Sequence, residues 1–149
     1  MAKRAFQLHS EININASVEQ VWSVFMDFEK YPEWNPFILS ITGEAKKGET
    51  IQAILLNPGS SKMKFTPKVL SFDPGREFRW LGHLFFPGLF DGEHYFQFSQ
   101  NLDGSTRFVQ GESFRGILVP LLKNMLNTKT QKGFELMNAA LKERVEKMG

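Results

Sequence analysis

The C-terminal stretch, residues 116–149, constrains the fold most, because its apolar residues recur at intervals of three and four. That spacing places them on one face of a helix, and we expect one long amphipathic helix that begins near Ile117. A single helix cannot bury such a stripe by itself, so the rest of the chain must cover it. The stripe consists of Phe134, Met137, Leu141, Val145 and Met148.

The helical pattern has a weak point in its middle. Residues 127–132, NTKTQK, are polar and interrupt the stripe, and Gly133 follows them. Glycine in a helix costs ~1 kcal/mol relative to alanine, so Gly133 indicates a close approach or a bend. The alternative is a short separate helix ahead of the main one, with a break near residues 127–130.

Nearly everything before this helix has the period of β-strands. Residues 5–14 alternate apolar and polar side chains, and six further strand-like runs between residues 37 and 114 are separated by short turns. Between the first two strands, Ser17 and Gln20 have the spacing of a helix capping box, and a second helical turn is expected near residues 28–31. The sequence therefore predicts an α+β fold, in which a seven-stranded antiparallel curved sheet wraps around the C-terminal helix and two short helices lie between strands 1 and 2.

Length and composition limit the class of protein. The 149 residues suit one domain, spanning 1–149, and a net charge of +2 from dispersed basic residues gives no reason to expect a nucleic-acid partner. The absence of cysteine fits a reducing compartment, and the first residues lack the apolar run of a secretory signal, so we expect a cytoplasmic protein. No window approaches the ~18 apolar residues of a membrane span, so we expect no stable membrane insertion. No phosphate loop, nucleophile elbow or two-histidine spacing occurs, so no cofactor or metal is expected.

One predicted hairpin can be aligned residue by residue. The loop Leu102-Asp103-Gly104 has the form of a three-residue hairpin turn with glycine in the left-handed conformation, which makes Asn101 and Ser105 partners. A two-residue turn would shift the register by one and place Glu112 opposite Tyr95. The first register keeps the aromatic residues of both strands on one face. It pairs Phe98 with Phe108, Phe96 with Gln110, and His94 with Glu112.

This register creates one polar cluster, His94, Gln110 and Glu112, on an otherwise apolar wall. A carboxylate opposite an imidazole favours the protonated ring and holds its orientation. His94 and Glu112 are therefore candidate catalytic residues, able to polarise a carbonyl or move a proton. The alternative is a buried polar pair that satisfies itself and fixes the register of two strands.

Further residues are expected around a pocket between the sheet and the helix. Of Arg79 and Trp80 one must face inward, and Arg79 in that position could pair with a ligand carboxylate or with Glu112. The loop at residues 84–90, LFFPGLF, is too apolar for an ordinary turn and indicates a gate or an exposed patch. The candidate ligand-binding residues are His94, Phe96, Phe98, Phe108, Gln110, Glu112, Phe114, Arg79, Trp80, Trp34 and Met137.

Several runs resemble the START-like, Bet v 1-like superfamily, also called SRPBCC, and within it the polyketide cyclase/dehydrase branch. These runs are INASVEQVWSVFMDFEKYPEWNPFI, FDGEH, TRFVQGESFRGILVP and GFELMNAALKERVE, and the resemblance extends over essentially the whole chain. The resemblance implies a helix-grip fold with a deep apolar cavity. It implies a small hydrophobic ligand far more firmly than any reaction.

Three functional hypotheses follow. The first is a carrier or sensor that binds a lipid, an isoprenoid or a polycyclic aromatic in the cavity, as a monomer or weak homodimer. The second is a cyclase or dehydratase acting on a polyketide-like substrate, with His94 as acid/base and Glu112 holding it. The third is a partner-binding module whose pocket has collapsed. We expect binding rather than catalysis, although the sequence leaves enzymatic activity open.

Overall fold

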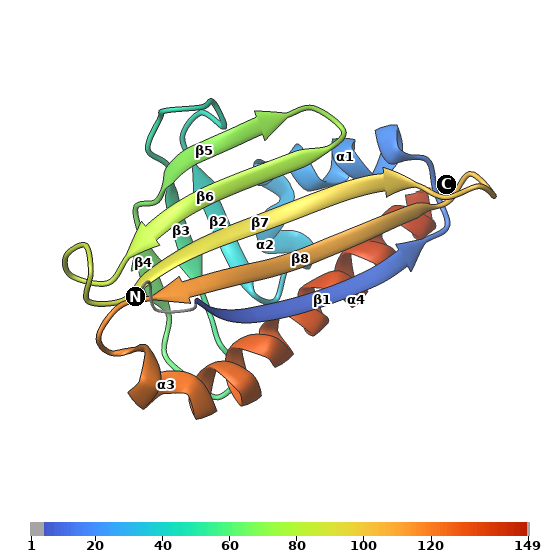
Figure 1. The fold of residues 1–149 in the computed structure, drawn as a ribbon. Coiled ribbons are helices and arrows are strands. Elements are labelled where there is room, and N and C mark those ends of the chain that lie inside the picture. Colours follow the sequence, from blue (N-terminus) through green and yellow to red (C-terminus); the bar gives the residue numbers. More distant parts are fainter. Residues whose placement is uncertain (1–4, 149) are drawn as a thin grey trace.

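The computed structural model describes residues 5–148, which form a curved antiparallel sheet around a long C-terminal helix (Figure 1). The strands that make up the larger sheet lie in the order β1-β8-β7-β6-β5, and the smaller sheet has the order β2-β3-β4. A single bridge between Thr50 and Lys68 links the two. The strands are β1 (Phe6–Ile14), β2 (Ile38–Thr42), β3 (Gln52–Leu55), β4 (Met63–Phe65), β5 (Lys68–Asp73), β6 (Glu77–His83), β7 (Asp91–Gln100) and β8 (Thr106–Arg115).

Two short helical segments lie between β1 and β2, as the sequence predicts. Helix α1 (Val18–Met26) begins at a complete capping box, in which the Ser17 hydroxyl accepts from the Gln20 backbone and the Gln20 side chain accepts from the Ser17 backbone. It buries Val21 and Phe25 completely. A 3₁₀ turn, η1 (Phe28–Lys30), leads directly into α2 (Tyr31–Trp34). These segments close one end of the space enclosed by the sheet (Figure 1).

One predicted strand is divided. The run from residue 62 to 72 reads as a single strand in the sequence, whereas the structure ends β4 at Phe65 and starts β5 at Lys68. Pro67 lies between them, and a proline cannot donate to a sheet ladder. The described residues therefore form eight strands in place of the predicted seven, and the antiparallel helix-grip architecture is unchanged.

The C-terminal helix follows a continuous helical path with a change of pitch. Helix α3 (Val119–Met125) passes through a π-helical turn, η2 (Leu126–Thr130), into α4 (Gln131–Met148). The Gln131 amide donates to the Leu126 carbonyl, the five-residue spacing of a π turn. The polar interruption in the sequence thus marks this π turn rather than a break, and the helix starts two residues after Ile117.

The apolar stripe of α4 packs onto the inner face of the sheet as expected, with one exception. Phe134, Met137, Leu141 and Val145 are buried, whereas Met148 is exposed. Gly133 is the predicted close approach, because a Cβ atom placed there would lie 2.5 Å from Cδ1 of Phe37. Among the described residues no helix is both long and apolar enough to cross a membrane.

Candidate functional site

A cavity of about 80 Å³ lies between one end of the sheet and the α3–η2 part of the C-terminal helix. The inner faces of β3, β4, β6, β7 and β8 form its walls, and Leu84 and Phe90 border it from the loop between β6 and β7. Its lining is mostly apolar. Residues that the sequence did not single out for this role include Phe37, Ala53, Met125, Leu126 and Thr130.

The predicted hairpin places three of the candidate residues at this cavity, and the neighbouring strand adds a fourth. The β7–β8 register is the predicted one, with His94 opposite Glu112 and Gly104 in the left-handed region at φ 89°. His94 and Glu112 line the cavity together with Phe114 from the same strand as Glu112. Trp80 from β6 also lines it, so Trp80 rather than Arg79 is the inward-facing residue of that pair.

Four other candidates belong to the packed core and do not line the cavity: Phe96, Phe98, Phe108 and Met137. Phe96, Phe98 and Phe108 continue the inner face of the sheet toward the hairpin loop, where helix α1 fills the space, and Met137 lies on α4. Phe25 of α1 lies 4.8 Å from Phe96 between ring centroids. The predicted aromatic wall is therefore real, but only half of it faces a cavity, because α1 packs against the other half.

Trp34 also lies away from the cavity. It ends helix α2, is half-buried, and packs against Tyr31 with ring centroids 5.1 Å apart. A ligand-binding role for Trp34 has no geometric support in this structure.

Arg79 lies on the outer face of the sheet, so it pairs with neither Glu112 nor a ligand in the cavity. Its guanidinium contacts Glu93 at 2.6 Å and Glu77 at 2.9 Å. Burial alone would raise the pKa of Glu77, but hydrogen bonds from Arg79, Gln97 and Ser71 hold that pKa below its ordinary value. The arginine thus ties the outer faces of β6 and β7 together.

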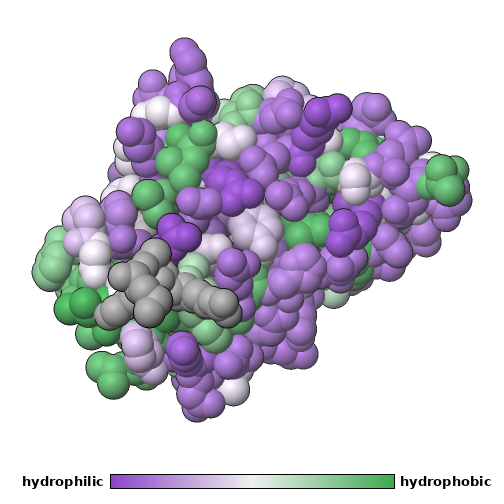
Figure 2. Space-filling model, in the orientation of Figure 1, coloured by the Kyte–Doolittle hydropathy of each residue, from purple (hydrophilic) through white to green (hydrophobic). Residues whose placement is uncertain are grey.

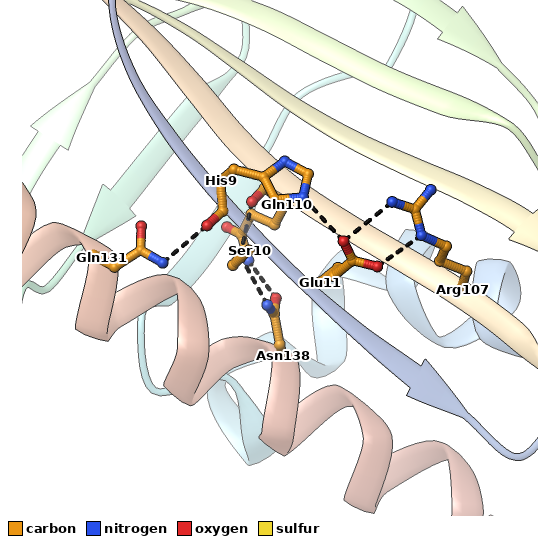
Figure 3. Close-up of polar contacts among 7 residues, drawn as sticks. All are labelled: His9, Ser10, Glu11, Arg107, Gln110, Gln131 and Asn138. Carbon is orange, nitrogen blue, oxygen red and sulfur yellow. Dashed lines mark hydrogen bonds and ion pairs between the residues drawn. The ribbon is translucent and has the colours of Figure 1, made fainter.

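A chain of buried polar side chains links the cavity wall to the C-terminal helix, and Figure 3 shows its inner part, formed by Ser10, Gln110 and Asn138. His94 Nε2 lies 2.9 Å from Oε1 of Gln110, and Nε2 of Gln110 donates to Oδ1 of Asn138 at 2.8 Å. Asn138 Nδ2 donates to the Ser10 hydroxyl at 2.9 Å. That hydroxyl donates in turn to the backbone carbonyl of Gln110 at 2.7 Å. The four residues come from β7, β8, α4 and β1, and all are buried.

Glu112 completes this chain at the cavity end. Its Oε1 lies 3.3 Å from Nδ1 of His94, with the two side chains 14% and 2% exposed. Gly92 makes room for this carboxylate, because a Cβ atom on Gly92 would collide with Glu112 Oε2. Both side chains line the cavity, but both ring nitrogens of His94 face protein atoms, which leaves the Glu112 carboxylate as the polar group of the pair available to a ligand.

The loop between β6 and β7 borders the cavity with some of its apolar side chains and exposes others. Leu84 and Phe90 border the cavity, whereas Phe85 and Phe86 are 83% and 59% exposed. Ile117 is joined to the loop by its backbone amide, which donates to Gly88. With Leu121 these exposed side chains belong to the end of the molecule where apolar surface gathers in Figure 2.

The remaining ionisable groups give no metal site. Within residues 5–148 no group of three or more His, Cys, Asp or Glu side chains has the geometry to hold a metal ion. His83 and His9 each have one carboxylate neighbour, Asp91 at 2.8 Å and Glu11 at 3.2 Å. The first of these histidines also borders the cavity, a position that its sequence context did not predict.

A sheet that grips a C-terminal helix around a small apolar cavity defines a helix-grip protein of START-like type. The chain belongs to the family described as polyketide cyclase / dehydrase and lipid transport, whose model matches residues 5–146. Family and fold together make it a ligand-binding domain of the START/polyketide cyclase type. No curated protein matches the sequence.

Several solved structures share the fold at low sequence identity. A START superfamily protein from Mycobacterium smegmatis is 20% identical, with a TM-score of 0.73 over 96% of this chain and 99% of that one. The Zhui aromatase/cyclase from Streptomyces sp. R1128 is 16% identical, with a TM-score of 0.76 over 95% and 94% of the two chains. A protein from Thermus thermophilus is 20% identical, with a TM-score of 0.74 over 97% and 99%.

Proposed function

We propose that this protein binds a small hydrophobic or amphipathic molecule in the cavity between the sheet and the C-terminal helix. The observation that carries the proposal is the contrast within the cavity wall, where mostly aromatic and aliphatic side chains surround the shielded His94–Glu112 pair. The apolar lining supplies affinity by burial, at ~25 cal/mol per Å² of apolar surface removed from water. The polar pair orients one end of the ligand.

Ligand entry requires the cavity wall to move. The cavity volume of about 80 Å³ is well below the roughly 300–1,000 Å³ of pockets that enclose drug-sized ligands. Met63 and Met125 are part of the lining, and the unbranched methionine side chain rearranges readily around an incoming molecule. Leu84 and Phe90 lie on a loop, so their displacement does not break a strand ladder.

Native mass spectrometry of protein purified from its own host tests the binding function. We expect a reproducible apolar passenger that leaves on denaturation, and uptake of one molecule per chain from a panel of lipids, quinones and aromatic polyketides. A bare chain mass with no uptake from the panel would contradict the proposal. In that case the exposed Phe85 and Phe86 favour the third hypothesis, a partner-binding protein with a collapsed pocket.

The second candidate function is a cyclase or dehydratase that acts on a polyketide-like substrate. The observation that favours it is the placement of a histidine and a carboxylate 3.3 Å apart on the cavity wall, where a proton could be exchanged with a bound molecule. Turnover assays with a linear poly-β-ketone separate the two functions. A cyclase predicts pH-dependent product formation that disappears in His94→Ala while binding persists, whereas a carrier predicts binding without product in both proteins.

A further inference from the structure

The buried polar chain determines which nitrogen of the His94 ring carries a proton. The direction of every hydrogen bond in the chain follows from the Gln110 backbone carbonyl, which cannot donate. The backbone carbonyl of Gln110 can only accept, so the Ser10 hydroxyl donates to it and must accept from Asn138. Asn138 then turns its oxygen toward Gln110, which donates to it and offers its own oxygen to His94. Nε2 of His94 must therefore carry a proton.

The other ring nitrogen faces a carboxylate. Nδ1 of His94 lies 3.3 Å from Oε1 of Glu112, and both side chains are largely shielded from water. A bare Nδ1 and an ionised carboxylate would repel each other at that distance. The pair consequently holds one proton beyond the one on Nε2, either on the ring or on the carboxyl group, and His94 has no free N–H left for a ligand.

The cavity thus offers a ligand an acceptor and no net positive charge, because the His94–Glu112 pair is neutral overall in either proton arrangement. Glu112 faces the cavity, and in either proton arrangement its second oxygen, Oε2, accepts hydrogen bonds. Among the described residues that line the cavity none is a lysine or an arginine, because Arg79 lies outside. The remaining polar lining side chains are Asn57, Thr130 and His83, and His83 is held by Asp91.

We infer that the cavity selects a neutral ligand whose polar end is a hydroxyl group, a phenol or an alcohol, which donates to Glu112, and that it rejects carboxylates. Gln110, Asn138 and Ser10 are positioning residues, because they hold His94 so that Glu112 remains an acceptor. This inference rests on the proposed binding function and narrows its ligand class. A fatty acid would bring a carboxylate into this cavity with no net charge to offset it, because the His94–Glu112 pair is already neutral overall.

Nitrogen-15 NMR of labelled histidine tests the proton arrangement without any ligand. The chain has three histidines, so His9→Ala and His83→Ala identify the His94 signals by subtraction. We expect Nε2 of His94 to be protonated in the unaltered protein and in Glu112→Gln, and Asn138→Leu to allow the other tautomer while the fold is retained. A neutral ring with a bare Nε2 in the unaltered protein would overturn the inference.

Binding of three matched probes tests the ligand class: 2-naphthol, 2-naphthoate and naphthalene share one ring system and differ in the polar group. We expect 2-naphthol to bind about tenfold or more tighter than 2-naphthoate, since a hydrogen bond to Glu112 is gained and the burial of an uncompensated charge is avoided. Gly92→Ala should reduce this ratio, because its Cβ displaces the Glu112 carboxylate. Gly82→Ala is the matched control, since its Cβ would meet only Pro67 at 3.8 Å.

The outcomes separate the inference from the function on which it rests. If 2-naphthoate binds as tightly as 2-naphthol, or if Gly92→Ala and Gly82→Ala leave the same ratio, the hydroxyl preference is wrong while ligand binding stands. If none of the three probes binds, the proposed function fails and the ligand preference fails with it. The NMR measurement then still decides whether the buried chain sets the His94 tautomer.

Discussion

At the scale of single residues, glycines decide how closely the two layers of this fold approach. Gly133 lies on the buried side of α4, directly against the ring of Phe37. Phe37 in turn lines the cavity and packs against Phe134, with ring centroids 5.5 Å apart. The absence of one side chain on the helix therefore sets the position of a cavity wall.

Gly133→Ala should destabilise the protein even though alanine favours helices by ~1 kcal/mol. The new Cβ would lie 2.5 Å from Phe37, and overpacking of this kind costs roughly 1–3 kcal/mol. Urea denaturation monitored by circular dichroism measures the net change. Adding Phe37→Leu should recover much of the loss. A Gly133→Ala protein that is more stable than the unaltered chain would show that the close approach is not tight in solution.

Individual residues also show where sequence reasoning succeeded. The positions of His94, Gln110 and Glu112 followed from one hairpin loop, because a three-residue turn fixes the register of both strands. Ser10 and Asn138 were missed, although a signal existed. Ser10 occupies an inward position in the alternation of β1, and Asn138 lies on the apolar face of α4 between Phe134 and Leu141. A polar residue at each of these two otherwise apolar positions indicated that both side chains form buried hydrogen bonds.

At the scale of elements, the β7–β8 hairpin depends on the conformation of its loop, which substitutions at Gly104 can test. Gly104 has φ 89° and no atom within 4 Å of an added Cβ, so a side chain there meets backbone strain and no clash. We expect Gly104→Ala to lower the free energy of unfolding by about 1 kcal/mol. Gly104→Asn should cost less, because asparagine tolerates the left-handed region. Equal losses in both variants, measured by denaturant titration, would contradict a conformational origin.

The outer faces of β6 and β7 make a pH-dependent contribution through Glu77 and Arg79. The folded-state pKa of Glu77 lies below its ordinary value of 4.5, so this stabilisation is present above that value and is lost as the pH falls through the folded-state pKa. Arg79→Ala should cost about 1 kcal/mol at neutral pH, a modest amount because the pair is partly exposed. The cost should shrink in thermal melts as the pH falls through the lowered folded-state pKa of Glu77 and the carboxylate becomes protonated. A cost independent of pH would indicate lost packing instead.

Two elements differed from the sequence prediction, one at a proline within a strand-like run and one at a change of helical pitch. The division of β4 from β5 depends on Pro67, which is buried at the point where the chain passes between the two sheets. The π turn η2 adds a residue to the helical repeat, and Leu126 and Thr130 at its two ends both line the cavity. The polar segment NTKTQK marked the place, but periodicity alone could not distinguish a change of pitch from a break.

At the scale of the whole molecule, the aromatic core is divided between a solid half and a hollow half. Helix α1 inserts Phe25 against the inner face of β7, and its ring centroid lies within 6.2 Å of those of Phe78, Phe96, Phe98 and Phe108. The cavity lies at the other end, near Trp80 and Phe114. The sequence predicted the helix-grip fold and an aromatic inner face, but the size of the cavity depends on how α1 and α3 pack, which periodicity does not report.

A cavity retained for a ligand should cost stability, and Ala53 offers a direct test. Ala53 lines the cavity from β3 and is fully buried. Ala53→Val adds two methyl groups, at ~0.8 kcal/mol for each buried carbon, so we expect an unfolding free energy higher by about 1 kcal/mol together with weaker binding of 2-naphthol. Gln52→Val is the control, because it adds a β-branched residue at the adjacent exposed position. Calorimetric melts and probe titrations of both variants measure the two effects. A less stable Ala53→Val protein would mean that the cavity offers no room at β3, and unchanged probe affinity would place the ligand elsewhere in the molecule.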